Sequence, residues 1–541
     1  MLDATMTKPA VRIEGLKIAL PEGADRLYAV DRVSFDLWPG KILCVVGESG
    51  SGKSMSANAL MGLLPEGLMV NDGRIRLGEE DLVGLSDAQM RALRGKRVAM
   101  IFQEPMSALN PLMRIEDQIA EVFEAHGLLR PAERRARALD LLTEVGLPDP
   151  KRAARAYPHQ LSGGQRQRVV IAMALALEPE VLVADEPTTA LDVTTQAQIL
   201  ELIRNLQQSR NMAVMFITHD FGVVAEIADY VTVMKLGRVV EEGPAERVLH
   251  HPEHPYTIGL IDAIPKLRAG RAAAPERPPL MQVEGACKTY RTGGGMFRKA
   301  RVVEAVKDIS VTIGRGETLG IVGESGSGKS SFGRCLVKLQ DLDAGRMLLD
   351  GQDMTHATGP ALQELRARVQ MIFQDPFSSL NPRIRVGQAI ADGPIAHGTP
   401  PKQAMAEAEA LLARVGLPGS AKRFPHEFSG GQRQRIGIAR ALALKPEIIV
   451  ADEAVSALDV SIQAQVLELL EELKRELGLS LVFITHDLRV AAQICDRVMV
   501  MQKGACVEIG PGAQVFDAPK HPYTRSLIEA IPGKDWDLAF S

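Results

Sequence analysis

The string GESGSGKS occurs twice in this chain of 541 residues, at 47–54 and again at 323–330. Each copy directly follows an apolar run, as expected for a loop that joins a buried strand to a helix. The pattern G-x-x-x-x-G-K-[ST] puts glycine where backbone N–H groups close around phosphate oxygens. Its lysine adds a positive charge for the phosphates, and its last hydroxyl is a ligand for Mg²⁺. The two copies predict two nucleotide-binding domains in one chain.

Five further motifs occur once in each half, and they follow the same order. The pairs are QEPMSALNP and QDPFSSLNP (103–111, 374–382), HQLSGGQRQR and HEFSGGQRQR (159–168, 426–435), ADEPTTALDV and ADEAVSALDV (184–193, 451–460), FITHD twice (216–220, 483–487), and HPYTIGLIDAIP and HPYTRSLIEAIP (254–265, 521–532). This order predicts two homologous domains in tandem, 1–265 and 281–541. The Pro-, Ala- and Arg-rich segment 266–280 is the expected linker.

Strand and helix patterns alternate along both halves. ILCVV, VLVAD and AVMFIT predict short buried strands of a parallel sheet, and the segments after GESGSGK and SGGQ predict helices. This alternation predicts the α/β class. The stretches 112–160 and 383–427 have a helical pattern without a strong strand signal, so a helical insertion is expected in each half.

Composition excludes several classes of protein. The 46% hydrophobic and 24% charged residues are typical of a globular protein, and the net charge of -4 gives no basic footprint for nucleic acid. The Arg-rich stretch 130–140 alternates with alanine and acidic residues, which favours a solvated helix face over a nucleic-acid patch. Five scattered cysteines without metal spacing fit a reducing compartment. No apolar run approaches ~18 residues and no secretory signal is seen, so a membrane role requires partner subunits.

Taken together, the motif order resembles the ATP-binding cassette (ABC) family over nearly all of both halves, and SGGQ is its most specific element. The resemblance implies two tandem ABC-type P-loop ATPase domains, each a RecA-like α/β core with a helical subdomain. It implies that both bind and hydrolyse ATP with Mg²⁺. It also implies that the two domains pair head to tail within the chain, with two ATP molecules between them.

The resemblance carries residue roles onto both halves. The phosphate-loop residues expected to bind ATP are Gly47, Ser49, Gly50, Ser51, Gly52, Lys53, Ser54, Gly323, Ser325, Gly326, Ser327, Gly328, Lys329 and Ser330. The expected ligands of Mg²⁺ are Ser54, Gln103, Asp185, Ser330, Gln374 and Asp452. The residues expected to act on the attacking water and the γ-phosphate are Glu186, Glu453, Gln103, Gln374, His219 and His486. Neither half lacks any of these types, so two hydrolysis-competent sites are expected.

The SGGQ segments precede helices, whose free N–H groups and positive dipole end bind anions. In this family, each segment closes on the γ-phosphate bound by the opposite domain. Accordingly, Ser429, Gly430, Gly431 and Gln432 are expected to complete the site of Lys53, and Ser162, Gly163, Gly164 and Gln165 that of Lys329. Tyr290 lies where the family has an aromatic residue that stacks on adenine, but the aligned residue in the first half is Leu20. Tyr28 either substitutes for it or packs in the core.

The longer strings around the glutamine motif and HPYT resemble ATPase subunits of peptide-type importers, the dipeptide, oligopeptide and nickel group. A single chain with both cassettes resembles the fused ATPases of the glutathione and microcin C importers. This implies a peripheral protein on the cytoplasmic face of the inner membrane. Its expected partners are two transmembrane permease subunits and, through them, an extracytoplasmic solute-binding protein, but no nucleic acid.

One further expectation follows from this branch, and one alternative function stands against it. Some members carry a cysteine cluster for an iron–sulfur centre after HPYT, but this chain has no cysteine between 258 and 286 or after Cys506, so no cluster is expected. The alternative function is that of a soluble tandem-cassette ATPase acting on ribosomes. The short linker, the acidic net charge and the HPYT strings argue against that alternative.

Overall fold

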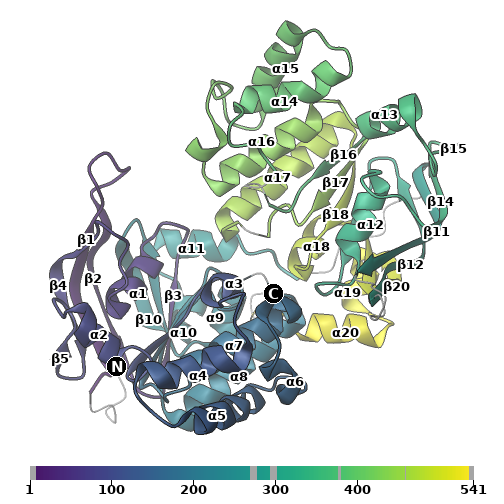
Figure 1. Cartoon of the computed structure of the whole chain (residues 1–541). Helices are drawn as coiled ribbons and strands as arrows, with labels where there is room; N and C mark the ends of the chain where they lie inside the picture. Colours follow the sequence, from purple (N-terminus) through teal and green to yellow (C-terminus); the bar gives the residue numbers. More distant parts are fainter. Residues whose placement is uncertain are drawn as a thin grey trace. The chain divides into compact units, whose positions relative to one another are not determined.

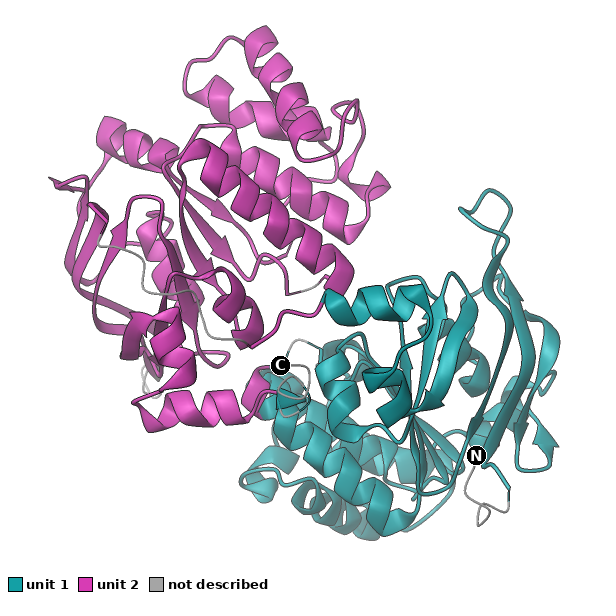
Figure 2. Cartoon of the chain, turned by 180° about the vertical axis from the view of Figure 1, so that it is seen from behind, with its two compact units in different colours: residues 1–191, 195–263, 532–541 teal, residues 192–194, 264–531 magenta. Residues whose placement is uncertain are grey.

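The computed structural model describes residues 8–189, 191–267, 277–292, 301–375, 379–456, 458–534 and 536. The chain divides into two compact units, 1–191, 195–263 and 532–541 in one and 192–194 and 264–531 in the other (Figure 2). Most of the expected linker 266–280 lies outside the described residues, and a strand already begins at Pro279. The domain boundaries at 265 and 281 stay a prediction.

Each half contains a six-stranded, mostly parallel sheet (Figure 1). The order is β6-β7-β8-β3-β9-β10 in the first half and β16-β17-β18-β13-β19-β20 in the second, and only the β9–β10 and β19–β20 pairs are antiparallel. The strands are β3 Ile42–Val46, β6 Val98–Ile101, β7 Val181–Asp185, β8 Ala213–Ile217, β9 Tyr230–Lys235, β10 Arg238–Pro244, β13 Thr318–Val322, β16 Val369–Ile372, β17 Ile448–Asp452, β18 Ser480–Ile484, β19 Arg497–Gln502 and β20 Ala505–Pro511. Every residue of β3, β7 and β8 is buried, which explains why these runs show no alternation.

A second, antiparallel sheet accompanies each parallel one, and the sequence patterns did not indicate it. Its order is β2-β1-β4-β5 in the first half and β12-β11-β14-β15 in the second. The strands are β1 Val11–Ala19, β2 Tyr28–Leu37, β4 Val70–Leu77, β5 Glu80–Asp81, β11 Pro279–Thr292, β12 Arg301–Gly314, β14 Ala344–Leu349 and β15 Gln352–Asp353. Along β1, buried and exposed residues alternate at the start of the strand, as expected for a sheet with one solvated face.

Helices fill the connections, and the predicted helical insertions are confirmed. In the first insertion lie α4 Ile115–Ala125, α5 Pro131–Glu144, α6 Pro150–Ala154 and the short η1 Pro158–Gln160, and in the second α14 Val386–Ala396, α15 Pro401–Arg414 and η2 Pro425–Glu427. The other helices are α1 Lys53–Met61, α2 Asp87–Leu93, α3 Pro105–Ala108, α7 Gly163–Ala174, α8 Val193–Arg210, α9 Phe221–Ile227, α10 Ala245–His250, α11 Pro255–Asp262, α12 Lys329–Leu336, α13 Gly359–Arg368, α16 Gly430–Leu442, α17 Val460–Leu477, α18 Leu488–Ile494, α19 Gly512–Asp517 and α20 Pro522–Glu529. Among the described residues, no helix has the length and apolar character needed to cross a membrane.

The parallel sheet brings four motifs to one edge. In the first half, the phosphate loop follows β3, His219 follows β8, Glu186 follows β7 and Gln103 follows β6. These four strands are neighbours and run parallel, so their carboxyl ends lie side by side. The second half repeats the arrangement on β13, β18, β17 and β16.

Candidate active site

The phosphate loops pass so close to neighbouring backbone that certain positions admit only glycine. Gly52 has a φ of 103°, and a Cβ atom there would lie 2.6 Å from the carbonyl oxygen of Ala29. Gly328 has a φ of 105°, and its Cβ atom would lie 2.0 Å from the carbonyl oxygen of Ala305. Both loops therefore hold the same left-handed turn directly before the lysine. Ser51 and Ser327 are buried in these loops, whereas Ser49, Gly50, Ser325 and Gly326 are exposed.

The lysine of each loop folds back onto its own loop. Lys53 Nζ donates hydrogen bonds to the carbonyl oxygens of Gly47 at 2.6 Å and Glu48 at 2.9 Å. Lys329 Nζ makes the same two contacts in its loop, at 2.7 and 2.9 Å. Both side chains are buried, and burial lowers the pKa of Lys329. A cation held at this position is suited to charge-assisted hydrogen bonds with phosphate oxygens.

The hydroxyl that ends each loop meets the carboxylate that ends a neighbouring strand. Ser54 Oγ donates to Asp185 Oδ1 at 3.0 Å, and Ser330 Oγ donates to Asp452 Oδ1 at 2.8 Å. Burial raises the pKa of both aspartates. A paired hydroxyl and carboxylate are oxygen ligands of the kind that Mg²⁺ prefers, and a divalent cation would favour the ionised carboxylate. The residues present therefore fit a magnesium ion in both halves.

The glutamates that follow these aspartates have an uncommon backbone conformation. Glu186 has a φ of 46° and Glu453 a φ of 47°, in the left-handed region that non-glycine residues rarely adopt. Each is held there by a hydrogen bond from its N–H group to the adjacent strand, to Ile217 at 3.0 Å and to Ile484 at 2.9 Å. Such strain persists where the surroundings enforce it, often at functional sites.

In the first half, the Glu186 carboxylate contacts two of the expected neighbours and one further residue. Gln103 Nε2 donates to Glu186 Oε2 at 2.9 Å, and His219 Nδ1 lies 3.2 Å from Oε1. Thr189 Oγ1 also donates to Oε2 at 2.9 Å. The structure thus brings the predicted glutamine, glutamate and histidine together and adds a threonine that the sequence showed only as a difference between the halves.

The second half repeats this cluster with one difference. Gln374 Nε2 donates to Glu453 Oε2 at 2.6 Å, and His486 Nδ1 lies 3.5 Å from the same oxygen. Ser456, the counterpart of Thr189, donates to the backbone carbonyl of Glu453 and not to its carboxylate. Residues 376–378 of the second glutamine motif lie outside the described residues.

Each histidine stabilises the ionised form of the glutamate beside it. Burial alone would raise the pKa of Glu186, but the hydrogen bond and charge of His219, with further help from Thr189 and Lys53, lower it to about 2. The same opposition lowers the pKa of Glu453, and Glu453 in turn raises the pKa of His486 against the effect of burial. An ionised carboxylate at neutral pH is what a general base requires.

Each SGGQ segment forms a capping box at the start of its helix. Ser162 Oγ accepts a hydrogen bond from the Gln165 N–H group at 3.3 Å, and Gln165 Oε1 accepts one from the Ser162 N–H group at 3.0 Å. Ser429 and Gln432 repeat the box at 3.4 and 3.1 Å. The polar side chains of the motif therefore fix the helix end, whose first N–H groups have no partner within the helix.

The predicted adenine-stacking residues differ between the halves. Tyr290 lies on β11, and its hydroxyl bonds to the side chain of Gln340. Leu20 packs against the hydrophobic core of the first half, and Tyr28 is the half-buried first residue of β2.

Arg26 is a contact of the first phosphate loop that no motif indicated. Its guanidinium group donates to the carbonyl oxygen of Gly50 and, at 2.9 Å, to that of Tyr28. The strand registers align Tyr28 with Glu304, so Val302 takes the place of Arg26 in the second half. The position depends on the path of the β1–β2 hairpin, which no local sequence pattern reveals.

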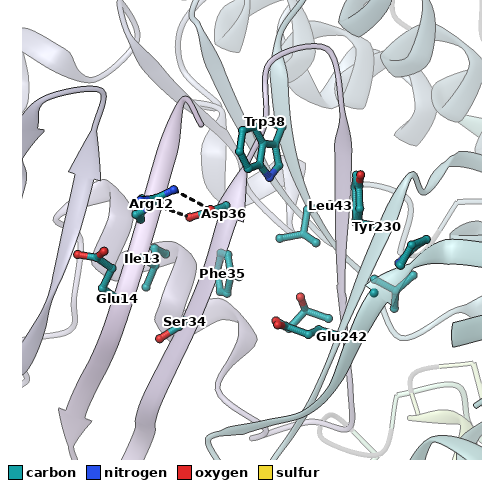
Figure 3. A pocket seen from close by; sticks show the side chains of 14 residues that line it. Arg12, Ile13, Glu14, Ser34, Phe35, Asp36, Trp38, Leu43, Tyr230 and Glu242 are labelled. Atoms are coloured by element: carbon teal, nitrogen blue, oxygen red, sulfur yellow. Dashed lines mark hydrogen bonds and ion pairs between the residues drawn. The ribbon is translucent and has the colours of Figure 1, made fainter. Parts of the chain in front are cut away.

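A further cavity of the first half lies away from these motifs. It has a volume of about 480 Å³ and opens between β2 and the β9–β10 hairpin, with Trp38, Tyr230 and the Arg12–Asp36 ion pair around it (Figure 3). Leu43, near the start of β3, also lines it, whereas the phosphate loop follows the other end of that strand. The cavity is therefore separate from the candidate active site.

Comparison with protein families gives two matches in each half. The ABC transporter family profile matches residues 30–189 and 306–456. The profile of the C-terminal region of oligopeptide/dipeptide transporters matches residues 240–291 and 507–538. The second profile covers the HPYT motifs of both halves.

Individual relatives extend over almost the whole chain. The glutathione import ATP-binding protein GsiA of Salmonella choleraesuis (strain SC-B67) is 47% identical over 567 residues, which cover 98% of this chain and 91% of that protein. The protein of the same name from Escherichia coli (strain K12) is 48% identical over 554 residues, covering 96% and 89%. A solved ATP-binding cassette in a post-hydrolysis state with ADP and Pi is 30% identical, covers 43% of this chain and 98% of its own, and has a TM-score of 0.40. With ABC regions in both halves and such identity from end to end, the chain belongs to the ABC transporter family, as an ATP-binding, ATP-hydrolysing protein with two cassettes.

Proposed function

We propose that this chain is the ATPase subunit that drives an ABC importer of peptides or peptide-like solutes, glutathione among them. One observation carries the proposal. Each cassette contains both a complete hydrolytic cluster and the region typical of oligopeptide/dipeptide transporters. A chain that only bound nucleotide would not need, in both cassettes, an ionised glutamate beside a glutamine and a histidine. The relatives named for glutathione import support the class of cargo.

We assign the chemistry in each cassette to the clustered side chains. Lys53 and Lys329 bind the β- and γ-phosphates, and the Ser54–Asp185 and Ser330–Asp452 pairs hold Mg²⁺, which supplies charge stabilisation at the phosphates when bound. Glu186 and Glu453 orient the attacking water and accept its proton. Gln103, Gln374, His219 and His486 position those carboxylates and contact the water or the γ-phosphate.

The partners and location follow from the same assignment. We propose that two transmembrane permease subunits hold the chain at the cytoplasmic face of the inner membrane, and that an extracytoplasmic solute-binding protein delivers the cargo to them. The chain itself does not contact the cargo. We also propose that it works without an iron–sulfur cluster, because no cysteine lies between 258 and 286 or after Cys506.

The test is reconstitution of the chain with its membrane partners. The partners are identified by mass spectrometry after purification of the chain from membranes, and the complex is placed in proteoliposomes with the binding protein. We expect ATPase activity to rise when the binding protein carries glutathione or a short peptide. Labelled solute should accumulate on the side of the membrane opposite the binding protein. The matched control is the complex with Glu186→Gln and Glu453→Gln, which should assemble but not transport. Co-purification with ribosomes, with ATPase stimulated by ribosomes and not by permeases, would exclude the importer function.

A further inference from the structure

The HPYT motif of each cassette touches the phosphate loop through its tyrosine. The hydroxyl oxygen of Tyr256 accepts a hydrogen bond from the N–H group of Glu48 at 3.2 Å. In the second cassette, the hydroxyl oxygen of Tyr523 accepts one from the N–H group of Glu324 at 3.1 Å. The two contacts join corresponding residues in both cassettes, so a single accidental rotamer does not explain them.

A second set of bonds fixes the start of the helix that carries the tyrosine. In the first cassette, the Glu241 carboxylate on β10 accepts from the N–H groups of Glu253 at 2.9 Å and His254 at 3.1 Å. His254 Nδ1 then caps α11 by accepting from the Tyr256 N–H group at 3.1 Å. The tyrosine is therefore attached to the sheet on one side and to the phosphate loop on the other.

The second cassette builds the same support from its own residues. Glu508 on β20 accepts from the N–H groups of Lys520 at 2.9 Å and His521 at 3.0 Å. His521 Nδ1 accepts from the Tyr523 N–H group at 3.2 Å. Burial raises the pKa of Tyr523 to about 12, so its hydroxyl stays neutral at physiological pH.

The residue that each tyrosine contacts also binds the catalytic lysine. The Glu48 N–H group bonds to Tyr256, while the Glu48 carbonyl oxygen accepts from Lys53 Nζ at 2.9 Å. Glu324 is bonded in the same two ways, to Tyr523 and to Lys329. One peptide segment thus links the tyrosine hydroxyl to the ammonium group that the proposed function places on the phosphates.

We propose that Tyr256 and Tyr523 are positioning residues for the phosphate loops, and that through them the C-terminal HPYT region sets the affinity of each cassette for ATP. The inference rests on the proposed function for its consequence in nucleotide binding. The hydroxyl holds the N–H group of the loop's second residue, which keeps the following N–H groups and the lysine in the geometry that phosphate needs. Because coupling between sites is reciprocal, a phosphate in the loop also stabilises the docked HPYT helix.

The test removes only the hydroxyls, with Tyr256→Phe, Tyr523→Phe and the double variant in the full chain. Loss of one hydrogen bond changes an equilibrium by roughly two- to tenfold. We expect the KM for ATP and the dissociation constant of a non-hydrolysable ATP analogue to rise by that factor, with kcat almost unchanged. The matched control is Tyr230→Phe, because Tyr230 lines the separate cavity of Figure 3. Wild-type ATP affinity in the double variant would overturn the inference and leave the proposed function standing.

Amide hydrogen exchange tests the contact without relying on ATP. In the nucleotide-free chain, Tyr256→Phe should speed exchange in the segment 42–52, and Tyr523→Phe in the segment 318–328, by roughly two- to tenfold. Tyr230→Phe should change neither segment. If both Phe variants exchange like wild type while Tyr256→Ala unfolds the region, the ring packs but the hydroxyl positions nothing, and the inference is wrong. If exchange changes but the wild-type chain hydrolyses no ATP, the inference on the loop stands and the proposed function falls.

Discussion

At the scale of single residues, the backbone and side chain of Glu186 and Glu453 are held by more contacts than the sequence motif indicates. Each has a left-handed backbone, a hydrogen bond to the next strand and a carboxylate held by a glutamine and a histidine. A side chain that only capped a turn would not need its charge stabilised in this way. The constraint is consistent with a carboxylate that must face a water molecule in one orientation.

Replacing these carboxylates should remove hydrolysis while leaving ATP binding in place. Loss of a positioned general base typically costs ~10²–10⁴-fold in rate, so the Glu186→Gln, Glu453→Gln double variant should show at least that loss in phosphate release. Binding of a fluorescent ATP analogue should stay near wild type, because glutamine preserves the shape of the site. The single variants need not be equal, since Thr189 bonds to the carboxylate in one cassette and Ser456 to a backbone carbonyl in the other. A wild-type rate in Glu453→Gln combined with no activity in Glu186→Gln would show that only the first cassette hydrolyses.

The His486–Glu453 pair predicts a pH-dependent contribution to stability. The folded-state pKa of His486 is raised above 6.5, so its contribution is complete below pH 6.5 and is lost as pH rises through the raised value. The pKa of Glu453 is lowered from 4.5, so its contribution is complete above pH 4.5 and is lost as pH falls through the lowered value. His486→Gln should therefore lower the Tm of the nucleotide-free chain most between these two pH values, with a difference that shrinks at alkaline pH. His397→Gln, at the exposed end of α14, is the control, and an equal Tm difference at all pH values would contradict the ion pair.

At the scale of elements, the two glycines of each SGGQ motif have different reasons to be glycine. A Cβ atom at Gly431 would lie 2.4 Å from Ile462 Cγ2 on α17, whereas one at Gly430 would meet nothing within 4 Å. The first cassette shows the same difference. A Cβ atom at Gly164 would lie 2.4 Å from Thr195 Cγ2, whereas one at Gly163 would lie 3.9 Å from Leu191. The second glycine of the motif therefore allows close packing of α7 on α8 and of α16 on α17.

Alanine substitutions in the second cassette should separate this packing role from anion binding. Gly431→Ala should destabilise the chain relative to Gly430→Ala by about 1–3 kcal/mol, because Ile462 must move to admit the methyl group. Both variants gain the same helix propensity, so the difference isolates the clash. Urea unfolding of the two variants measures it, and equal midpoints would show that Ile462 yields at no cost.

The sequence predicted the parallel strands, the helical insertions and the clustered motifs, because each of these rests on a local pattern. Buried runs such as Ile42–Val46 end in motif residues, and parallel pairing then places the motifs at one edge. The antiparallel sheets were not predicted, since β1 and β2 are interrupted by bulges that blur the alternation. The contacts of Arg26 and Tyr256 with the phosphate loop were missed for another reason. They join segments whose approach depends on the path of the chain between them.

At the scale of the whole molecule, the two cassettes have the same elements but different details. Arg26 contacts one phosphate loop and Val302 stands at the corresponding position of the other half, while Tyr290 in the second half aligns with Leu20 in the first. The sites proposed for the two cassettes are therefore chemically distinguishable. Variants can address one site at a time.

Paired variants test the head-to-tail pairing that the family resemblance implies. If Lys53 shares a site with Ser429, then Lys53→Ala with Ser429→Arg damages one site and leaves the other complete. Lys53→Ala with Ser162→Arg would then damage both. We expect the first pair to keep the residual ATPase activity of Lys53→Ala alone, and the second pair to fall below it. The reverse order, or equal activity in both pairs, would contradict the assignment.

The tandem repeat also fixes the ratio of the two ATPase domains and their local concentration. Asp262 at the end of α11 and Pro279 at the start of β11 are joined by a segment short enough to span at most about 60 Å. A tether of this length keeps each domain at an effective concentration on the order of millimolar around the other, whatever the amount of protein in the cell. Every copy of the chain thus carries one Arg26-type and one Tyr290-type domain in strict one-to-one ratio. Dilution should weaken ATPase activity far less in the intact chain than in a mixture of separately produced halves.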